Sequence, residues 1–359
     1  MIPLAEVLCR HWPAYERQFG ADILPSHRRA VQCILACRTR ALGGEVYRCP
    51  DCRQDHFVYH SCNHRACPQC GNADATEWIQ RQKLKLLPAP YYLVTFTVPE
   101  GLRAWLRSHQ KLGCALLLRE SAETLQDVAS QPKYLGAQLG SLSVLHTWGR
   151  QLQYHPHVHC VVPAGGLRQD GLRWMRPPSP DFFLPQAVLA DRFRNRLKRR
   201  LAQEHPEELA HIPSGVWQQK WVVDVQAVGS GEAALKYLAA YVYRTALGSQ
   251  RILSDHGGKI TLRYKDSGDA QWHILTLPVM EFLRRFLQHV LPKGLQRVRY
   301  YGWLSPAAKT RWERILALLD WKPAALQAGP VVSPLCPRCA GPLIWIATLT
   351  RAPPRPHTV

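Results

Sequence analysis

Hydrophobic and polar positions recur with two different periods along the chain, and together they predict both strands and helices. Runs rich in β-branched and aromatic residues predict strands at 91–98, 142–150, 155–162 and 220–228. Apolar residues spaced three and four apart predict helices at 76–87, 103–125, 180–203, 232–247 and 279–291. Three further alternating runs, with a Gly-Gly turn, predict antiparallel strands at 251–256, 259–265 and 272–278. The expected fold class is therefore α+β, with helices beside an antiparallel sheet.

The length of 359 residues exceeds one domain of usual size, so several units are expected. We expect a small N-terminal module at 1–88, a large α+β domain at 89–290 and a basic extension at 291–359. The extension ends in the Pro-rich run RAPPRPHTV, whose composition predicts disorder. No apolar run reaches the length of a membrane span, and charges interrupt the N-terminus, which favours a cytoplasmic protein without a signal peptide.

The charge balance is strongly positive. There are 46 Lys and Arg residues against 26 Asp and Glu, a formal net charge of +20. This surplus indicates an anionic partner, most simply DNA, although a merely basic protein would show the same surplus. Interleaved aromatic side chains favour single strands, whose bases stack on rings, unless these rings belong to the core: Trp148, Trp174, Phe193, Trp272, Tyr300, Tyr301 and Trp303. The preferred candidates for DNA contact are Arg244 and, within the run 293–303, Lys293, Arg297 and Arg299.

Five of the twelve cysteines lie between positions 49 and 70. Cys49 with Cys52, and Cys67 with Cys70, form two CxxC pairs separated by fourteen residues, a spacing typical of a structural zinc site. The neighbouring residues either build a second site or are a buried thiol and surface polar groups: Cys37, His56, His60, Cys62 and His64. A later CxxC pair, Cys336 and Cys339, supplies only half of the ligands of a zinc site. No second pair follows it in the sequence, so a metal there is doubtful.

The stretch YHPHVHC places three histidines two residues apart on an expected strand. Because alternate side chains of a strand share one face, His155, His157 and His159 point the same way. His157 and His159 suit a divalent cation with open positions, although strand histidines often bind nothing.

The expected helix 232–247 carries Tyr237 and Tyr241 at i and i+4, with Arg244 extending the same stripe. A tyrosine pair on a helix is commonly a half-buried packing contact. A tyrosine hydroxyl has a pKa near 10, so it becomes a useful nucleophile when a cation assists the reaction.

Together these motifs resemble the HUH endonucleases of the two-tyrosine class, and more narrowly the rolling-circle transposases of the insertion sequence ninety-one type. The segments CRTRALGGEVYRCPDC and SCNHRACPQC resemble their zinc-binding domain, which implies zinc binding and DNA recognition for the module at 1–88. HTWGRQLQYHPHVHCVVPAGG and YLAAYVYRTALGSQRI resemble blocks of their transposase domain, which implies an HUH-type nuclease domain at 89–290. The resemblance implies that His157 and His159 bind the metal and that Tyr237 and Tyr241 are nucleophiles. It leaves the third ligand open between His155, His146 and a glutamine or carboxylate elsewhere.

The resemblance further implies nicking of one DNA strand, covalent 5′ attachment and transfer of single-stranded DNA from the ends of the protein's own element. Mg²⁺ or Mn²⁺ at the histidine pair and structural Zn²⁺ at the cysteines would be the cofactors. A rolling-circle replication initiator would use the same two motifs. Two different classes of protein also fit part of the pattern: a non-catalytic zinc-dependent DNA-binding regulator, and a metallohydrolase with zinc on His155, His157 and His159.

Overall fold

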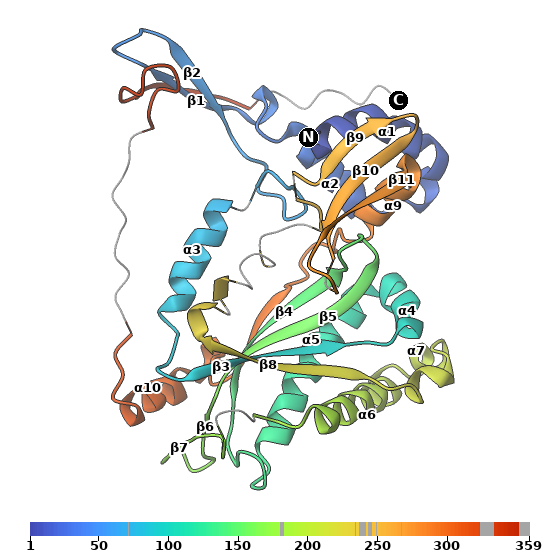
Figure 1. Ribbon diagram of the computed structural model, residues 1–359, viewed down its shortest axis with the longest axis vertical. Coiled ribbons are helices and arrows are strands. Elements are labelled where there is room, and N and C mark those ends of the chain that lie inside the picture. Colours follow the sequence, from blue (N-terminus) through green and yellow to red (C-terminus); the bar gives the residue numbers. More distant parts are fainter. Residues whose placement is uncertain are drawn as a thin grey trace. The chain divides into compact units, whose positions relative to one another are not determined.

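The computed structural model divides the chain into two compact units, each built from separate segments of the sequence (Figure 1). The first comprises Met1–Asp74, Tyr243–Val290 and Leu326–Val359, and the second comprises Ala75–Val242 and Leu291–Ala325. The structure describes residues 1–70, 72–179, 183–233, 235–236, 242, 246–248, 250–266, 268–323 and 334–351.

This division differs from the three continuous domains expected at 1–88, 89–290 and 291–359. Residues 243–290 belong to the compact unit of the N-terminus, and so do the last residues of the chain. The cause is long-range pairing that no local pattern reveals. The Ile2 amide donates to the Ile252 carbonyl at 3.1 Å, and Arg10 forms an ion pair with Asp255 at 2.6 Å.

The first unit contains two three-stranded antiparallel sheets with helices beside them. One sheet has the order β13-β1-β2 and the other the order β11-β10-β9. The strands are β1 (Gly44–Arg48), β2 (Asp55–Tyr59), β9 (Ile252–His256), β10 (Lys259–Lys265), β11 (Trp272–Pro278) and β13 (Ile344–Leu349). The helices are α1 (Leu4–Phe19), α2 (Pro25–Ala36) and α9 (Val279–Leu287), with 3-10 turns at Gly20–Asp22 and Arg40–Leu42.

The second unit is built on a five-stranded antiparallel sheet of order β12-β4-β5-β3-β8 (Figure 1). Its strands are β3 (Pro90–Thr97), β4 (Gly140–Trp148), β5 (Tyr154–Pro163), β8 (Val222–Ser230) and β12 (Val298–Gly302). The helices are α3 (Asn72–Lys83), α4 (Arg103–Ser108), α5 (Gln110–Ala129), α6 (Gln186–Glu204), α7 (Pro206–Ala210) and α10 (Lys309–Leu318). A small hairpin (β6, Gly166–Leu167; β7, Trp174–Met175) and 3-10 turns at Glu100–Leu102, Ser214–Trp217 and Pro306–Ala308 also belong to it.

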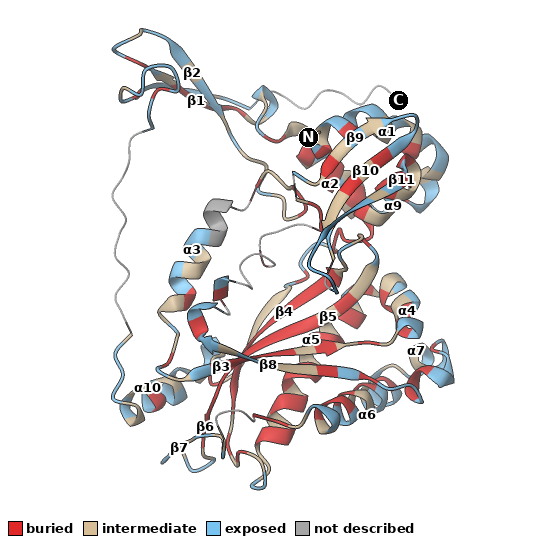
Figure 2. Cartoon of the chain, in the orientation of Figure 1, coloured by how far each residue is buried: buried red, intermediate tan, exposed pale blue. Residues whose placement is uncertain are grey.

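Helices α5 and α6 cover one face of this sheet and enclose the core. Alternate residues of β3 and β5 point into it, among them Phe96, Val158 and Cys160. Phe96 meets Phe193 of α6 edge to face, with ring centroids 5.0 Å apart. Strands β4 and β5 are buried along most of their length, as expected for the middle of a sheet (Figure 2).

A buried carboxylate holds α6 against α5. Glu120 is 0% exposed and lies 3.0 Å from the Arg200 guanidinium and 3.3 Å from that of Arg196. Two of the basic residues of α6 therefore serve the interior of the fold, because a buried carboxylate needs a cationic partner.

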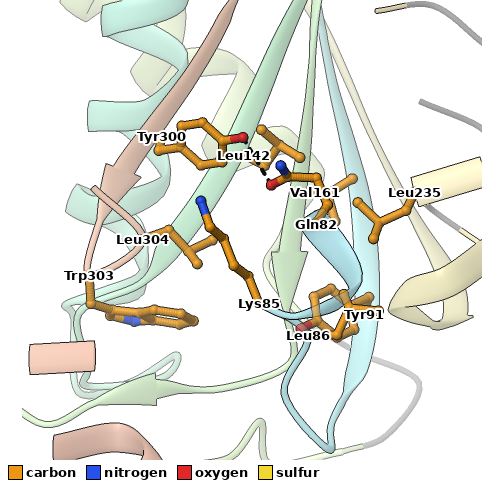
Figure 3. A pocket seen from close by; sticks show the side chains of 10 residues that line it. All are labelled: Gln82, Lys85, Leu86, Tyr91, Leu142, Val161, Leu235, Tyr300, Trp303 and Leu304. Carbon is orange, nitrogen blue, oxygen red and sulfur yellow. Dashed lines mark hydrogen bonds between the residues drawn. The ribbon is translucent and has the colours of Figure 1, made fainter. Parts of the chain in front are cut away.

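The opposite face of the sheet carries α3. Gln82 of α3 accepts a hydrogen bond from the Tyr300 hydroxyl at 2.9 Å, and the Lys85 ammonium lies 4.4 Å from the centre of the Tyr300 ring. These side chains line a pocket with Leu142, Val161 and Leu235 (Figure 3). Burial lowers the pKa of Lys85.

The α+β class with an antiparallel sheet is confirmed, and so are the strands expected at 91–98, 142–150, 155–162 and 220–228. The helix expected at 103–125 is interrupted at His109, which divides α4 from α5. Most of the helix expected at 232–247, and the tail 352–359, lie outside the described residues. Among the helices that the structure describes, none combines the length and the apolar character that crossing a membrane requires.

Candidate metal centres

Three histidines converge on the face of the large sheet that α5 and α6 leave uncovered. His157 and His159 are alternate residues of β5, and His146 of β4 lies directly opposite His157 in the antiparallel register. The centroid of the His146 ring lies 5.1 Å from that of His157 and 4.5 Å from that of His159. One nitrogen from each of the three rings lies within 4.8 Å of the others, close enough to share one ion.

Hydrogen bonds orient two of these rings. The Nδ1 atom of His157 lies 2.7 Å from the carbonyl oxygen of His155, which can only accept, so Nδ1 carries the proton and Nε2 presents a lone pair. The Nδ1 atom of His159 lies 2.9 Å from the Thr95 hydroxyl of β3. Bonds of this kind at the distal nitrogen are typical of metal-binding histidines, because they fix the ring and its tautomer.

Burial favours the neutral state that coordination needs. Desolvation lowers the pKa of His157 to about 4 and that of His159 to about 3, and it lowers the pKa of His146 well below the usual range. Three neutral imidazoles from two adjacent strands fit a divalent cation that keeps open positions for other ligands.

The structure groups His146, rather than His155, with His157 and His159. The spacing along a strand explains this choice. His155 and His159 are four residues apart, which is roughly 13 Å along an extended strand, so a single ion cannot reach both. A residue directly opposite on the next strand is only about 5 Å away, as His146 is from His157.

Thr95 is a residue of this site that sequence reasoning missed. It lies opposite His159, and Asp224 of β8 lies opposite Thr95, so all three share one sheet face. A signal was present in YYLVTFTV, where Thr95 and Thr97 alternate with apolar residues in the same way as the histidines of β5.

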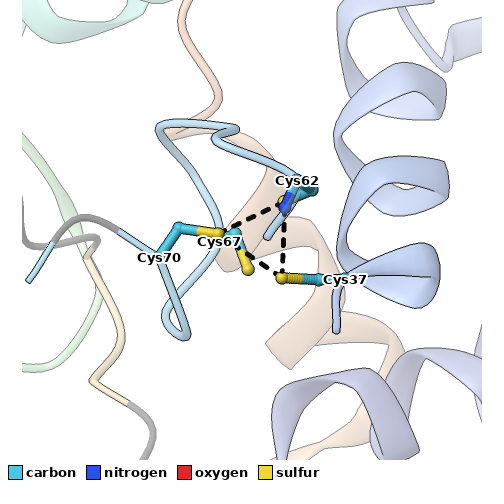
Figure 4. A group of neighbouring side chains, drawn as sticks. All are labelled: Cys37, Cys62, Cys67 and Cys70. Carbon is cyan, nitrogen blue, oxygen red and sulfur yellow. Dashed lines mark hydrogen bonds between the residues drawn. The ribbon is translucent and has the colours of Figure 1, made fainter. Parts of the chain in front are cut away.

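Four cysteines form a second candidate metal centre in the first unit (Figure 4). Cys37 directly follows α2, whereas Cys62, Cys67 and Cys70 come from the loop after β2. The sulfur of Cys70 lies 3.4 Å from that of Cys37 and 3.5 Å from that of Cys62. Four thiols this close together fit zinc, whose tetrahedral thiolate site has sulfur atoms about 3.8 Å apart.

This grouping differs from the expected site of Cys49, Cys52, Cys67 and Cys70. Cys49 and Cys52 form the tip of the β1–β2 hairpin. Cys67 and Cys70 are grouped with Cys37 and Cys62 at its base, where the Arg38 amide donates a hydrogen bond to the His60 carbonyl at 3.1 Å. Five residues of strand span roughly 17 Å, so the two CxxC pairs cannot share an ion. Cys37 and Cys62 complete the base site, and Cys49 and Cys52 lie beside Cys336 and Cys339.

Comparisons with known proteins identify the family of the chain. Residues 140–311 match a family described as "Putative transposase", and residues 7–98 match a family described as "Transposase zinc-binding domain" of the IS91 type. The chain is 37% identical to the "Putative transposase y4qJ" of Sinorhizobium fredii over 326 residues, which cover 84% of this chain and 80% of that protein. The chain belongs to the IS91-type transposases.

This transposase is also 29% identical to the "Transposase for insertion sequence element IS801" of Pseudomonas savastanoi pv. phaseolicola over 293 residues, covering 77% of the chain and 69% of that relative. No solved structure is significantly similar to it. Membership of the family makes the protein a DNA-binding enzyme that cuts and joins DNA. The matched segment 7–98 contains the group of Cys37, Cys62, Cys67 and Cys70, which is consistent with structural zinc.

The expected nucleophiles of the transposase, Tyr237 and Tyr241, lie outside the described residues, as does Arg244. Described residues on either side of the tyrosines are anchored to the second unit. Leu235 lines the pocket with Leu142 and Val161, and the Val242 carbonyl accepts a hydrogen bond from Arg297.

The residues expected to contact DNA have different surroundings. The Arg297 side chain donates a hydrogen bond to the Val242 carbonyl. Burial is the main cause of the lowered pKa of His146, and the positive charge of Arg297 is a smaller one. Arg299 pairs with Ser143, so it lies on the sheet face opposite the histidines. Lys293 is exposed. Of the aromatic candidates, Phe193 and Trp303 are buried core residues and Trp272 is exposed.

Proposed function

We propose that this transposase nicks and rejoins single-stranded DNA at the ends of its own element by tyrosine attack on a phosphodiester. The observation that carries the proposal is the group of His146, His157 and His159 on one sheet face, with ring orientations and protonation suited to a metal. We assign this chemistry to the second unit and DNA recognition to the zinc-binding domain.

The three histidines would hold Mg²⁺ or Mn²⁺ through their Nε2 atoms. When bound there, such an ion polarises the scissile phosphate and stabilises charge on the leaving oxygen. The chain's own contribution is orientation. The His155 carbonyl and the Thr95 hydroxyl hold the imidazoles, and β4 and β5 fix their spacing through the backbone ladder.

Tyr237 and Tyr241 would be the nucleophiles. Two observations on described residues support this assignment. Leu235, two residues before the pair, lines a pocket with Leu142 and Val161, and these two residues lie on the same sheet face as His157 and His159. Val242, directly after the pair, is bound by Arg297, whose charge acts on His146.

In the cleavage step the tyrosine oxygen forms a bond to phosphorus as the bond from phosphorus to the 3′ oxygen breaks. The phenolic proton passes to solvent, and the departing 3′ oxygen takes up a proton to become a 3′ hydroxyl. The product is a 5′-phosphotyrosine ester. Because the phosphoester is exchanged rather than hydrolysed, a 3′ hydroxyl can reverse the step and join a strand without ATP.

Charge supports DNA as the substrate, and its single-stranded form is part of the proposal. The formal net charge of +20 provides the counterions that phosphates need. Two tyrosines would allow a second transfer while the first strand remains attached, as rolling-circle transposition requires.

A covalent-adduct assay tests the proposal. The transposase is incubated with labelled single-stranded DNA from its element's end and Mg²⁺ or Mn²⁺, and the products are separated on a denaturing gel. We expect a metal-dependent adduct that is lost in His157→Ala and in the double Tyr237→Phe/Tyr241→Phe variant. His155→Ala is the matched control, since this histidine shares the strand but lies outside the metal group. An adduct that persists in the double tyrosine variant would overturn the mechanism.

A further inference from the structure

A second group of four cysteines remains unexplained by the DNA chemistry. Cys336 and Cys339 lie near the end of the chain, where the sequence offers them no neighbouring pair. The fold brings them to Cys49 and Cys52 at the tip of the β1–β2 hairpin. The sulfur of Cys49 lies 3.4 Å from that of Cys339, and the sulfur of Cys52 lies 3.7 Å from that of Cys336.

The two CxxC pairs adopt the same backbone turn, and each pair with its turn is called a knuckle below. The Cys49 carbonyl accepts from the Arg53 amide at 2.9 Å, and the Cys49 amide donates to Gln54 at 3.0 Å. In the other pair, the Cys336 carbonyl accepts from the Ala340 amide at 2.8 Å, and the Cys336 amide donates to Gly341 at 2.8 Å. Arg53 and Ala340 both have positive φ, at 56° and 60°, a conformation that costs energy for residues with a side chain.

The surroundings of the four thiols support a built site. Cys49 is 0% exposed and Cys336 is 2% exposed, and both pack against Leu343. The Nε2 atom of His56 lies 3.3 Å from the Cys336 sulfur. Strand β13, which begins soon after this knuckle, pairs with β1 from Leu349 to Ile344, so backbone hydrogen bonds bring the two knuckles together.

The distances between the sulfur atoms distinguish a disulfide from a metal site. A disulfide requires about 2.0 Å between sulfur atoms, well short of the observed 3.4 and 3.7 Å. A zinc ion with four thiolates has sulfur atoms about 3.8 Å apart. We propose that Cys49, Cys52, Cys336 and Cys339 bind a second structural Zn²⁺, separate from the zinc at Cys37, Cys62, Cys67 and Cys70.

This ion closes a very long loop, since Cys52 and Cys336 are 284 positions apart in sequence. Its ligands come half from the N-terminal hairpin and half from a segment beyond both matched family regions, which end at residues 98 and 311. The C-terminal segment is thus an integral part of the zinc-binding sheet formed by β13, β1 and β2. The proposal does not rest on tyrosine chemistry, so the two can fail independently.

Metal content of the full-length protein tests the proposal. The two cysteine groups predict that Cys336→Ser/Cys339→Ser loses one zinc equivalent per chain and that Cys67→Ser/Cys70→Ser also loses one. Cobalt substitution separates these sites from the histidines, because thiolate-to-cobalt absorption reports sulfur ligands alone. We expect each double variant to lose about half of that absorption. Unchanged zinc content and absorption in Cys336→Ser/Cys339→Ser would overturn the proposal.

Two further measurements guard against loss of folding. Cys339→His offers a replacement ligand at an exposed position, so we expect it to retain the zinc that Cys339→Ser loses. In the unmodified protein, maleimide should label the exposed thiol of Cys9 at once and that of Cys339 only after a chelator removes zinc. Equal labelling of Cys9 and Cys339 in the zinc-loaded protein would show that Cys339 is a free thiol and would overturn the proposal.

Discussion

The histidine group of the second unit and the cysteine groups of the first unit are assembled in opposite ways. The three histidines project from two neighbouring strands in the middle of a large sheet. The opposite face of that sheet packs on a hydrophobic core. The cysteines lie on turns and loops, and the residues packed around the knuckles at Cys49 and Cys336 form a very small cluster. The sheet would therefore form before any metal binds, whereas the cysteine segments need the metal as part of their core.

This difference predicts which part of the molecule depends on zinc. In the proposed function, the histidine site is preorganised by the sheet, and the ion it would hold serves chemistry. The cysteine sites replace hydrophobic burial that segments of this size cannot supply alone. Four experiments separate the two cases.

Removal of zinc with a strong chelator should have the largest effect. We expect residues 37–70 and 334–351 to lose protection in hydrogen exchange, because structural zinc contributes on the order of 10 kcal/mol to small sites. Strands β3, β4 and β5 should keep their protection, since their core is independent of thiols at these positions. Equal loss of protection in both regions would contradict the comparison.

Replacing the buried carboxylate of the second unit should produce the reverse pattern. Glu120→Gln leaves Arg196 and Arg200 without their buried partner, and we expect the unfolding free energy of this unit to fall by about 3 kcal/mol. Zinc content should not change. Urea denaturation measures the effect, with Glu204→Gln as the control, since this carboxylate is open to solvent and its loss should change the unfolding free energy little.

His146→Ala tests which histidine completes the metal group. Loss of one of three ligands should reduce DNA nicking by roughly 10²- to 10³-fold, because the ion supplies several kcal/mol of charge stabilisation. His155→Ala should change the rate by only about threefold or less. The rates are compared at saturating Mn²⁺ and again at limiting Mn²⁺. If His155→Ala is the more damaging variant, the grouping of His146 with β5 is wrong.

Thr95→Val should have the smallest effect of the four. The substitution removes the hydroxyl that orients His159 but keeps the shape of the side chain, so we expect Mn²⁺ affinity to fall by roughly 10- to 100-fold. Calorimetric titration measures this affinity. Thr97→Val serves as the control, because it lies opposite His157, whose Nδ1 is already bound to the His155 carbonyl. Equal losses in both variants would indicate a general effect on β3.

Local patterns predicted much of the second unit. The β-rich run at 91–98 and the histidine strand at 155–162 form β3 and β5 because their side chains alternate with a period of two, which depends only on nearby residues. The same period predicted that His157 and His159 share a face. It could not choose between His146 and His155, because the choice depends on the register between β4 and β5.

The sequence by itself determined the chemistry that the chain carries: paired thiols, a row of imidazoles, two tyrosines at helical spacing and a large positive charge. Tertiary structure alone decided which thiols meet. The two CxxC pairs closest in sequence lie at opposite ends of a hairpin, whereas Cys52 and Cys336 meet across 284 positions. The physical reason is that spacing along the chain limits distance only over a few residues. Beyond that range, strand pairing and burial determine which side chains come together.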